Sequence, residues 1–203
     1  MDEIKYNPLS DLSRIKESLL YLFKNTKDIT KLVMPNIEDE RFSFEENWFG
    51  GKYTKNIKGK TEIANIVGHC FDVPYIDGVI TDNRCAIFTE TYIIKAESAY
   101  IRQVGVDIFV VCHKDSVRLT PEETEYFNSI GIYGNRVDSA IQAINSAITD
   151  SEIMFEIQKK YSIGDLILSE RNPLERYVPG TKFYGKCLHY TYHTFNQRKS
   201  KAK

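Results

Sequence analysis

The sequence predicts an α+β fold with a mostly antiparallel sheet, a long β-hairpin and helices packed on one face. Three observations support this fold: a pair of long alternating segments between Asp82 and Asp115, amphipathic helical patterns on both sides of that pair, and two strand-like runs further on. We therefore expect a single α+β domain over residues 1–195, followed by a basic, disordered tail over residues 196–203.

The N-terminal segment predicts a helix that ends near Asn25. Ser10 or Asp11 can cap it. Its apolar residues recur on one face at helical spacing: Leu12, Ile15, Leu19, Leu22 and Phe23. A second short helical turn spans 26–34 and ends at Pro35.

Residues 36–60 predict an extended contact loop, because acids, aromatics, glycines and lysines are mixed there without a period. One interpretation is a solvated loop with local ion pairs, each contributing at most about 1 kcal/mol. The other is an arm that docks on a neighbouring subunit. Its aromatic residues favour docking, since Trp and Tyr often anchor contact surfaces. They include Trp48, Phe49 and Tyr53.

The long hairpin has the clearest pattern. Val104, Val106, Ile108, Val110 and Cys112 alternate with their neighbours to give one wholly apolar face, which should face a core. Upstream, Ala86, Phe88, Tyr92 and Ile94 alternate in the same way. Each arm would be roughly 40 Å long at the rise of a strand, so we expect part of the hairpin to project beyond the sheet. The predicted contacts at its tip are Glu97, Ser98, Ala99 and Tyr100.

The C-terminal half predicts two helices and two strands. Thr120 and Glu123 form a capping box around Pro121, so a short helix should run to about Ser129. Asn135 can cap the next helix, whose small polar positions offer no site. Its apolar residues form one stripe: Val137, Ala140, Ile141, Ile144, Ala147 and Ile148. The strands are expected at 165–169 and 182–195.

The bulk properties exclude several function classes. The formal net charge is −1 over 203 residues, so no global field attracts nucleic acid or an anionic membrane. No apolar window approaches a membrane span, and the first residues lack a signal-peptide pattern. The 4 cysteines include no C-x-x-C pair, which is typical of reduced, buried thiols. We expect a protein that contacts no membrane and stays in the cytoplasm where it is made.

The motif search predicts no catalytic, cofactor or metal site. The nucleotide, serine-hydrolase and zinc-protease patterns are absent from the sequence. Cys187, His189 and His193 share one face of a strand, yet closed zinc sites usually have tighter paired spacing. An ordinary amphipathic strand is favoured, and a small metal-dependent enzyme is the rival class. Within His69-Cys70 and Cys112-His113 the side chains of a strand point to opposite faces, so neither dipeptide can pair a thiol with its base.

Asp107 is an acid in the middle of a strand. It could be a catalytic or metal-binding carboxylate. The alternation instead favours a place on the outer sheet face, paired across the hairpin with a basic residue such as Arg84.

Three runs, at 89–115, 133–148 and 163–195, resemble bacteriophage neck and tail-completion proteins, especially tail terminators. They share a long hairpin, a helix after a glycine-containing turn, and a final pair of strands that ends in aromatics. The resemblance implies a structural virion protein, with no reaction, that forms a hexameric ring on the tail tube, stops its polymerisation and joins the head connector. The alternative it leaves open is a head-completion or connector protein of the same junction.

The resemblance also implies partners: further copies of the chain, the tail tube protein and the head connector or neck proteins. The basic tail, including Arg198 and Lys199, would meet the neck or passing DNA without sequence specificity. Localisation would be the virion neck after assembly in the host cytoplasm.

Overall fold

The computed structural model describes residues 10–33, 51–57, 60–66, 70–71, 85–96, 101–161 and 164–195. Its helices are α1 (Ser10–Asn25), α2 (Lys27–Val33), α4 (Pro121–Ser129), α5 (Arg136–Asp150) and α6 (Glu152–Tyr161), with a 3-10 helix η1 (Lys114–Ser116). Its strands are β1 (Gly51–Ile57), β2 (Lys60–Ile66), β3 (Cys70–Phe71), β4 (Cys85–Ala96), β5 (Ile101–His113), β6 (Ile167–Leu168), β7 (Leu174–Tyr177) and β8 (Phe183–Phe195). None of these described helices has the length and apolar character needed to cross a membrane.

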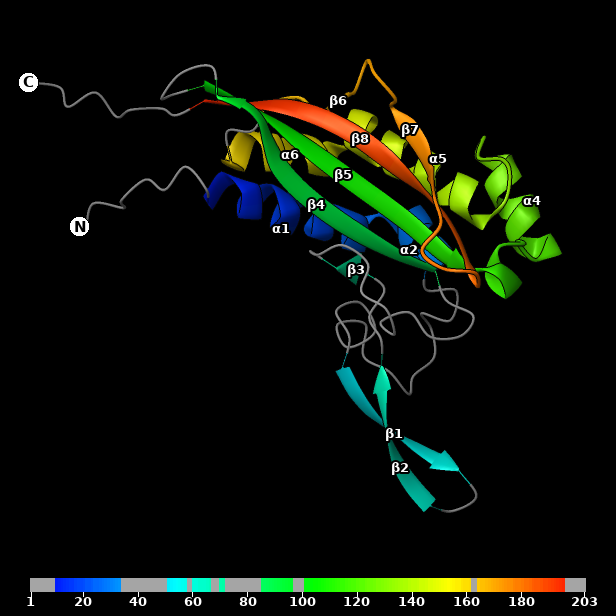
Figure 1. The fold of residues 1–203 in the computed structure, drawn as a ribbon. Helices are drawn as coiled ribbons and strands as arrows, with labels where there is room; N and C mark the ends of the chain where they lie inside the picture. The colour runs from blue at the N-terminus through cyan, green and yellow to red at the C-terminus, as the bar shows by residue number, and fades with distance from the viewer. Residues whose placement is uncertain are drawn as a thin grey trace, which may run out of the picture.

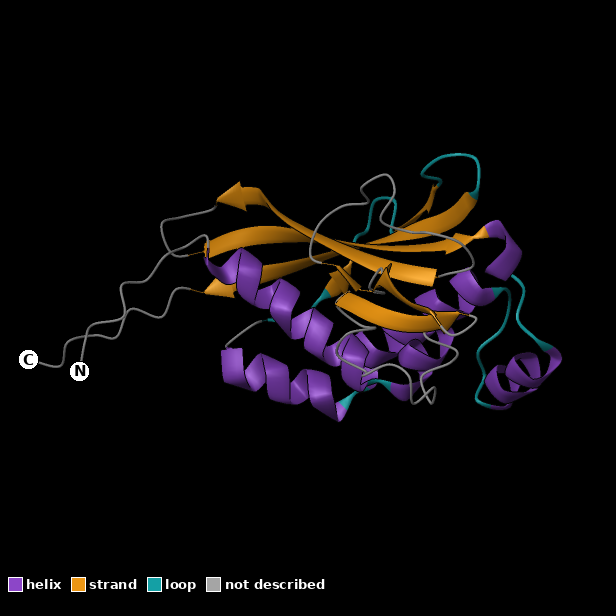
Figure 2. Ribbon diagram, turned by 90° about the horizontal axis from the view of Figure 1, so that it is seen from below, coloured by secondary structure: helices purple, strands orange, loops and turns teal. Residues whose placement is uncertain are grey.

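The main sheet has the order β3-β4-β5-β8-β6, and β7 also pairs with β8 (Figure 1). Every pair in it is antiparallel except β3 with β4. Helices α1, α2 and α5 contact this sheet, and α6 packs against α1 and α5. Figure 2 shows the helices gathered below the long strands. The predicted α+β class, with helices on one face of a mostly antiparallel sheet, is confirmed.

The long hairpin is confirmed as β4 and β5, which pair from Cys85 with Cys112 to Ala96 with Arg102. The part of the hairpin that the structure describes does not project beyond the sheet. Strand β8 pairs with β5 along all 13 residues of β5, from Ile101 to His113. The backbone groups of β5 therefore find hydrogen-bond partners on both sides, in β4 and in β8. The predicted tip residues, 97–100, lie outside the described residues.

The predicted core face of β5 is confirmed. All of its members are buried against the helices: Val104, Val106, Ile108, Val110 and Cys112. The stripe of α5 is buried as well, from Val137 to Ile148. On β4, however, the apolar alternation marks the opposite face. Ala86 and Phe88 pair with Val111 and Phe109 and join a small cluster on the outer side of the sheet.

The helix caps predicted at Thr120 and Asn135 are also confirmed. Thr120 accepts a hydrogen bond from the backbone N–H of Glu123, and the Glu123 carboxylate accepts one from the N–H of Thr120. The Asn135 side chain accepts from the N–H groups of Val137 and Asp138. These bonds satisfy N–H groups that a helix start leaves without an internal partner.

Several elements differ from the prediction. Helix α6 and strand β7 lie where no element is expected. The extended loop predicted over 36–60 is wrong in its last part, because β1 runs through 51–57 and pairs with β2, which begins at Lys60. Neither strand has a strong apolar alternation of its own, so only the pairing reveals them. Residues 36–50 and the predicted tail at 196–203 lie outside the described residues.

Candidate functional site

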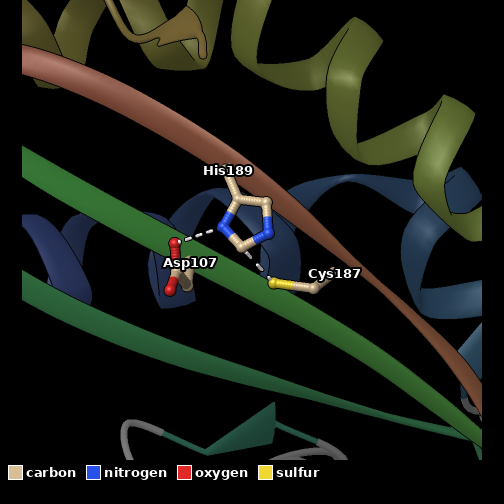
Figure 3. Close-up of side chains that lie close together, drawn as sticks. All are labelled: Asp107, Cys187 and His189. Atoms are coloured by element: carbon tan, nitrogen blue, oxygen red, sulfur yellow. Dashed lines mark hydrogen bonds and ion pairs between the residues drawn. The ribbon is translucent and has the colours of Figure 1, made fainter. Parts of the chain in front are cut away.

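Asp107, Cys187 and His189 meet on the outer face of the sheet, the face turned away from the helices (Figure 3). Asp107 on β5 lies directly opposite His189 on β8. Cys187 is two residues before His189, so strand alternation puts both side chains on one face. The His189 Nδ1 atom lies 2.7 Å from Asp107 Oδ1 and 3.9 Å from Cys187 Sγ. All three side chains thus converge on one small volume.

Tyr92 covers the next position along the strand. It pairs with Gly105, and a Cβ atom on Gly105 would lie only 2.5 Å from the Tyr92 ring. The glycine therefore makes room for the ring, whose hydroxyl donates a hydrogen bond of 3.2 Å to Asp107 Oδ1. Burial, together with the charge of Asp107, raises the pKa of Tyr92 to about 12. At neutral pH the Tyr92 hydroxyl is therefore protonated and can donate its hydrogen bond to Asp107.

The second ring nitrogen of His189 faces another acid. Its Nε2 atom is buried and lacks a hydrogen-bond partner, while Glu175 Oε1 on β7 lies 3.5 Å away. A small cavity of about 200 Å³ borders His189, Glu175 and Tyr92. Solvent can therefore approach His189 from the β7 side.

Cys187 does not form a nucleophile relay with this pair. Its side chain is fully buried, and burial, with the nearby carboxylates of Asp107 and Glu175, raises the pKa of the thiol far above its ordinary value. A Cys-His-Asp relay needs the thiol and the carboxylate on opposite ring nitrogens. Here both approach Nδ1. The arrangement gathers donor atoms and is not set up to pass a proton.

The outer-face position predicted for Asp107 is confirmed. Its observed partner is His189, whereas the expected partner, Arg84, lies outside the described residues. The trio considered as the rival metal site, Cys187 with His189 and His193, is only partly brought together. His193 is exposed and lies opposite Gln103, outside the cluster. The sequence does not predict the contact of Asp107 with His189, because that contact depends on the register between β5 and β8. The pattern of a single strand holds no information about register.

The predicted contact residues fall outside the described side chains. Tyr53 lies in β1, where only the backbone is described. The other predicted contacts lie outside the described residues altogether: Trp48, Phe49, Glu97, Ser98, Ala99, Tyr100, Arg198 and Lys199. They remain predictions.

Two apolar patches are exposed on different surfaces of the subunit. The β4-edge patch consists of Tyr92 and Ile94, which border the cavity beside His189, and the β6–β7 patch consists of Leu168 and Leu174. Strands β4 and β6 flank the central pair β5 and β8 on opposite sides (Figure 1). A cavity of about 520 Å³ adjoins the β6–β7 patch beside α5.

The comparison with protein families yields one match. The YomW family model matches residues 17–192, which is most of the chain. No curated protein and no solved structure matches it. The match indicates a phage origin and does not specify a place in the particle. The chain therefore belongs to the YomW family, a phage-derived family.

Proposed function

We propose that this phage-associated protein is a structural protein of the virion neck: a tail terminator that closes into a ring on the tail tube and joins it to the head connector. The observation that carries the proposal is the pair of exposed apolar patches on different surfaces of one sheet. The family's phage origin and the resemblance to tail terminators support the same assignment. The ring would be hexameric, as in the proteins it resembles, and would assemble in the host cytoplasm.

A ring of identical subunits needs two different contact surfaces on each subunit. Head-to-tail contacts join one surface to the other, and they close when the rotation between neighbours divides a full turn. The β4-edge patch and the β6–β7 patch meet this requirement. Ile94 is 47% exposed and Leu174 is 40% exposed, so each has apolar surface left to bury. Burying a large aliphatic side chain fully stabilises by about 1.5–3 kcal/mol.

Both patches lie on the main sheet, which can hold them in a fixed orientation relative to each other. Strands β4, β5 and β8 are paired over nearly their full lengths, and helices α1, α2 and α5 cover one face. A ring tolerates little angular variation between subunits. A sheet of paired strands is better suited to that demand than a loop.

Complementary patch variants test the head-to-tail contact. Ile94→Asp should block one surface and Leu168→Asp the other, so each variant alone should sediment as a monomer while the wild type forms a ring. Mixing the two should give dimers, because one intact surface of each kind remains. Phe155→Asp on α6, a change at a residue 63% exposed and away from both patches, is the matched control. A monomeric wild type at every concentration, or rings from either variant, would contradict the contact.

A phage carrying a stop codon in this gene tests the position in the particle. Loss of a terminator should leave tail tubes of abnormal length and heads without tails, because nothing stops tube growth. Loss of a connector should instead leave tails of normal length beside unjoined heads. Intact, infectious particles would contradict both assignments.

A further inference from the structure

We propose that Asp107, Cys187 and His189 form a binding site for a single Zn²⁺ ion on the outer face of the sheet. Carboxylate, thiolate and imidazole are the three ligand types that zinc takes in proteins. Their donor atoms all lie within 4.8 Å of one another. Ligands of a tetrahedral zinc ion stand about 3.3–3.8 Å apart, given bonds of about 2.0–2.3 Å. Small side-chain rotations therefore bring this cluster to a bound geometry.

The approach of both partners to one ring nitrogen favours an ion at the centre. Asp107 Oδ1 and Cys187 Sγ both lie near His189 Nδ1. A single proton on Nδ1 can serve only one of them well, whereas a cation placed between the three atoms contacts all of them. On binding, Nδ1 of His189 must give up its proton so that its lone pair can face the ion, and the neutral ring then carries its one proton on Nε2.

Two neighbouring residues, Glu175 and Tyr92, are placed to hydrogen-bond the proposed zinc ligands, as residues around zinc sites usually do. A ligating histidine usually donates its other ring N–H to a carboxylate. His189 Nε2 is buried without a hydrogen-bond partner, and Glu175 Oε1 lies 3.5 Å from it. With Nδ1 on the metal, Nε2 must carry the proton and can donate to Glu175. The Tyr92 hydroxyl orients the second ligand, Asp107, in the same way.

The site has a route for entry and a role within the sheet. The cavity beside His189 and Glu175 lets an ion and a water molecule approach the histidine. Water would fill the fourth position. The ion would join β5 to β8, and Glu175 would tie β7 to it. The ion would thus cross-link the strands on which the β6–β7 patch is built.

Titration of the full-length chain, freed of metal by a chelator, with Zn²⁺ tests the site by calorimetry. One equivalent should bind and raise the melting temperature. Co²⁺ should give an intense near-ultraviolet absorption band from its bond to the thiolate. Affinity should fall as pH falls, because the Cys187 thiol must lose its proton to bind.

Variants assign the ligands. Cys187→Ser should abolish the cobalt–thiolate band, and Asp107→Asn should weaken zinc binding. Glu175→Gln, which changes only a half-exposed outer-shell residue, should lower affinity about 10–100-fold without loss of folding. His193→Gln, on the same strand and face but outside the cluster, should bind like the wild type. A folded wild type that takes up no zinc, or a Cys187→Ser variant that binds as the wild type does, would overturn the proposal.

Discussion

Neighbouring residues on strand β5 build two different kinds of surface. Ile108 points to the helices and is fully buried among apolar side chains, while Asp107 points outward and contacts His189 and Tyr92. The helix-covered face gains stability from packing, which depends on shape and volume. The outer face depends on pairs of polar groups that meet only when the strands are in register. Substitutions on the first face should therefore change folding, and those on the second should change specific contacts.

The largest loss of stability is expected from Arg136→Ala on the helix side. The Arg136 guanidinium is buried and donates to Glu123, to the Ser116 carbonyl and to the Leu32 carbonyl. Removing it leaves the Glu123 carboxylate, also largely buried, without its partner. Breaking such a pair costs about 3–5 kcal/mol. Urea unfolding would measure this.

The control for that prediction is Lys186→Met. Lys186 pairs with Asp138 at 2.6 Å, but both side chains are partly exposed. The cost should stay within about 1 kcal/mol. Equal losses in the two variants would contradict the distinction between the buried pair and the surface pair.

Ile108→Ala should cost about 2–5 kcal/mol, because it leaves a cavity in a packed core. The same type of change at Ile94, which is exposed, should alter unfolding by no more than about 0.5 kcal/mol. It should nevertheless weaken oligomers, since Ile94 belongs to the β4-edge patch. Chemical denaturation and sedimentation of both variants would separate the two effects. Equal destabilisation would show that the two positions do not differ in packing as described.

Gly105→Ala should cost about 1–3 kcal/mol on the outer face, because the new methyl group meets the Tyr92 ring. In a Tyr92→Ala background the added cost should disappear, since the ring is gone. A thermodynamic cycle of the two changes measures this coupling. If the alanine costs the same in both backgrounds, the ring does not lie over the glycine.

The smallest expected effect is a pH dependence at Glu123. Burial alone raises the pKa of this carboxyl. Hydrogen bonds from Arg136 and the Thr120 backbone lower the pKa by more than burial raises it, so the net shift is downward. A lowered folded-state pKa stabilises the protein above the unfolded value, about 4.3 for Glu, and this stability is lost as pH falls through the folded value. The difference in melting temperature between wild type and Glu123→Gln should therefore shrink in acid. A constant difference down to the lowest pH would argue against the pairing.

The two faces also differ in how far the sequence predicts them. The core face of β5, the stripe of α5 and the caps at Thr120 and Asn135 follow local periods or local hydrogen bonds, and all are confirmed. The cluster of Asp107 with His189 depends on the register between residues 82 positions apart. Strands β1 and β2 likewise appear only through their pairing. Single-strand patterns carry no information about register, which is set by the whole sheet.

The central claim is that this phage-derived protein belongs to the virion neck. Immunogold electron microscopy, with an antibody to the protein on particles from a lysate of the producing cells, tests it most directly. A neck protein should give one band of label at the junction of head and tail on each particle. Label absent from every particle, with the protein remaining free in the lysate, would contradict it.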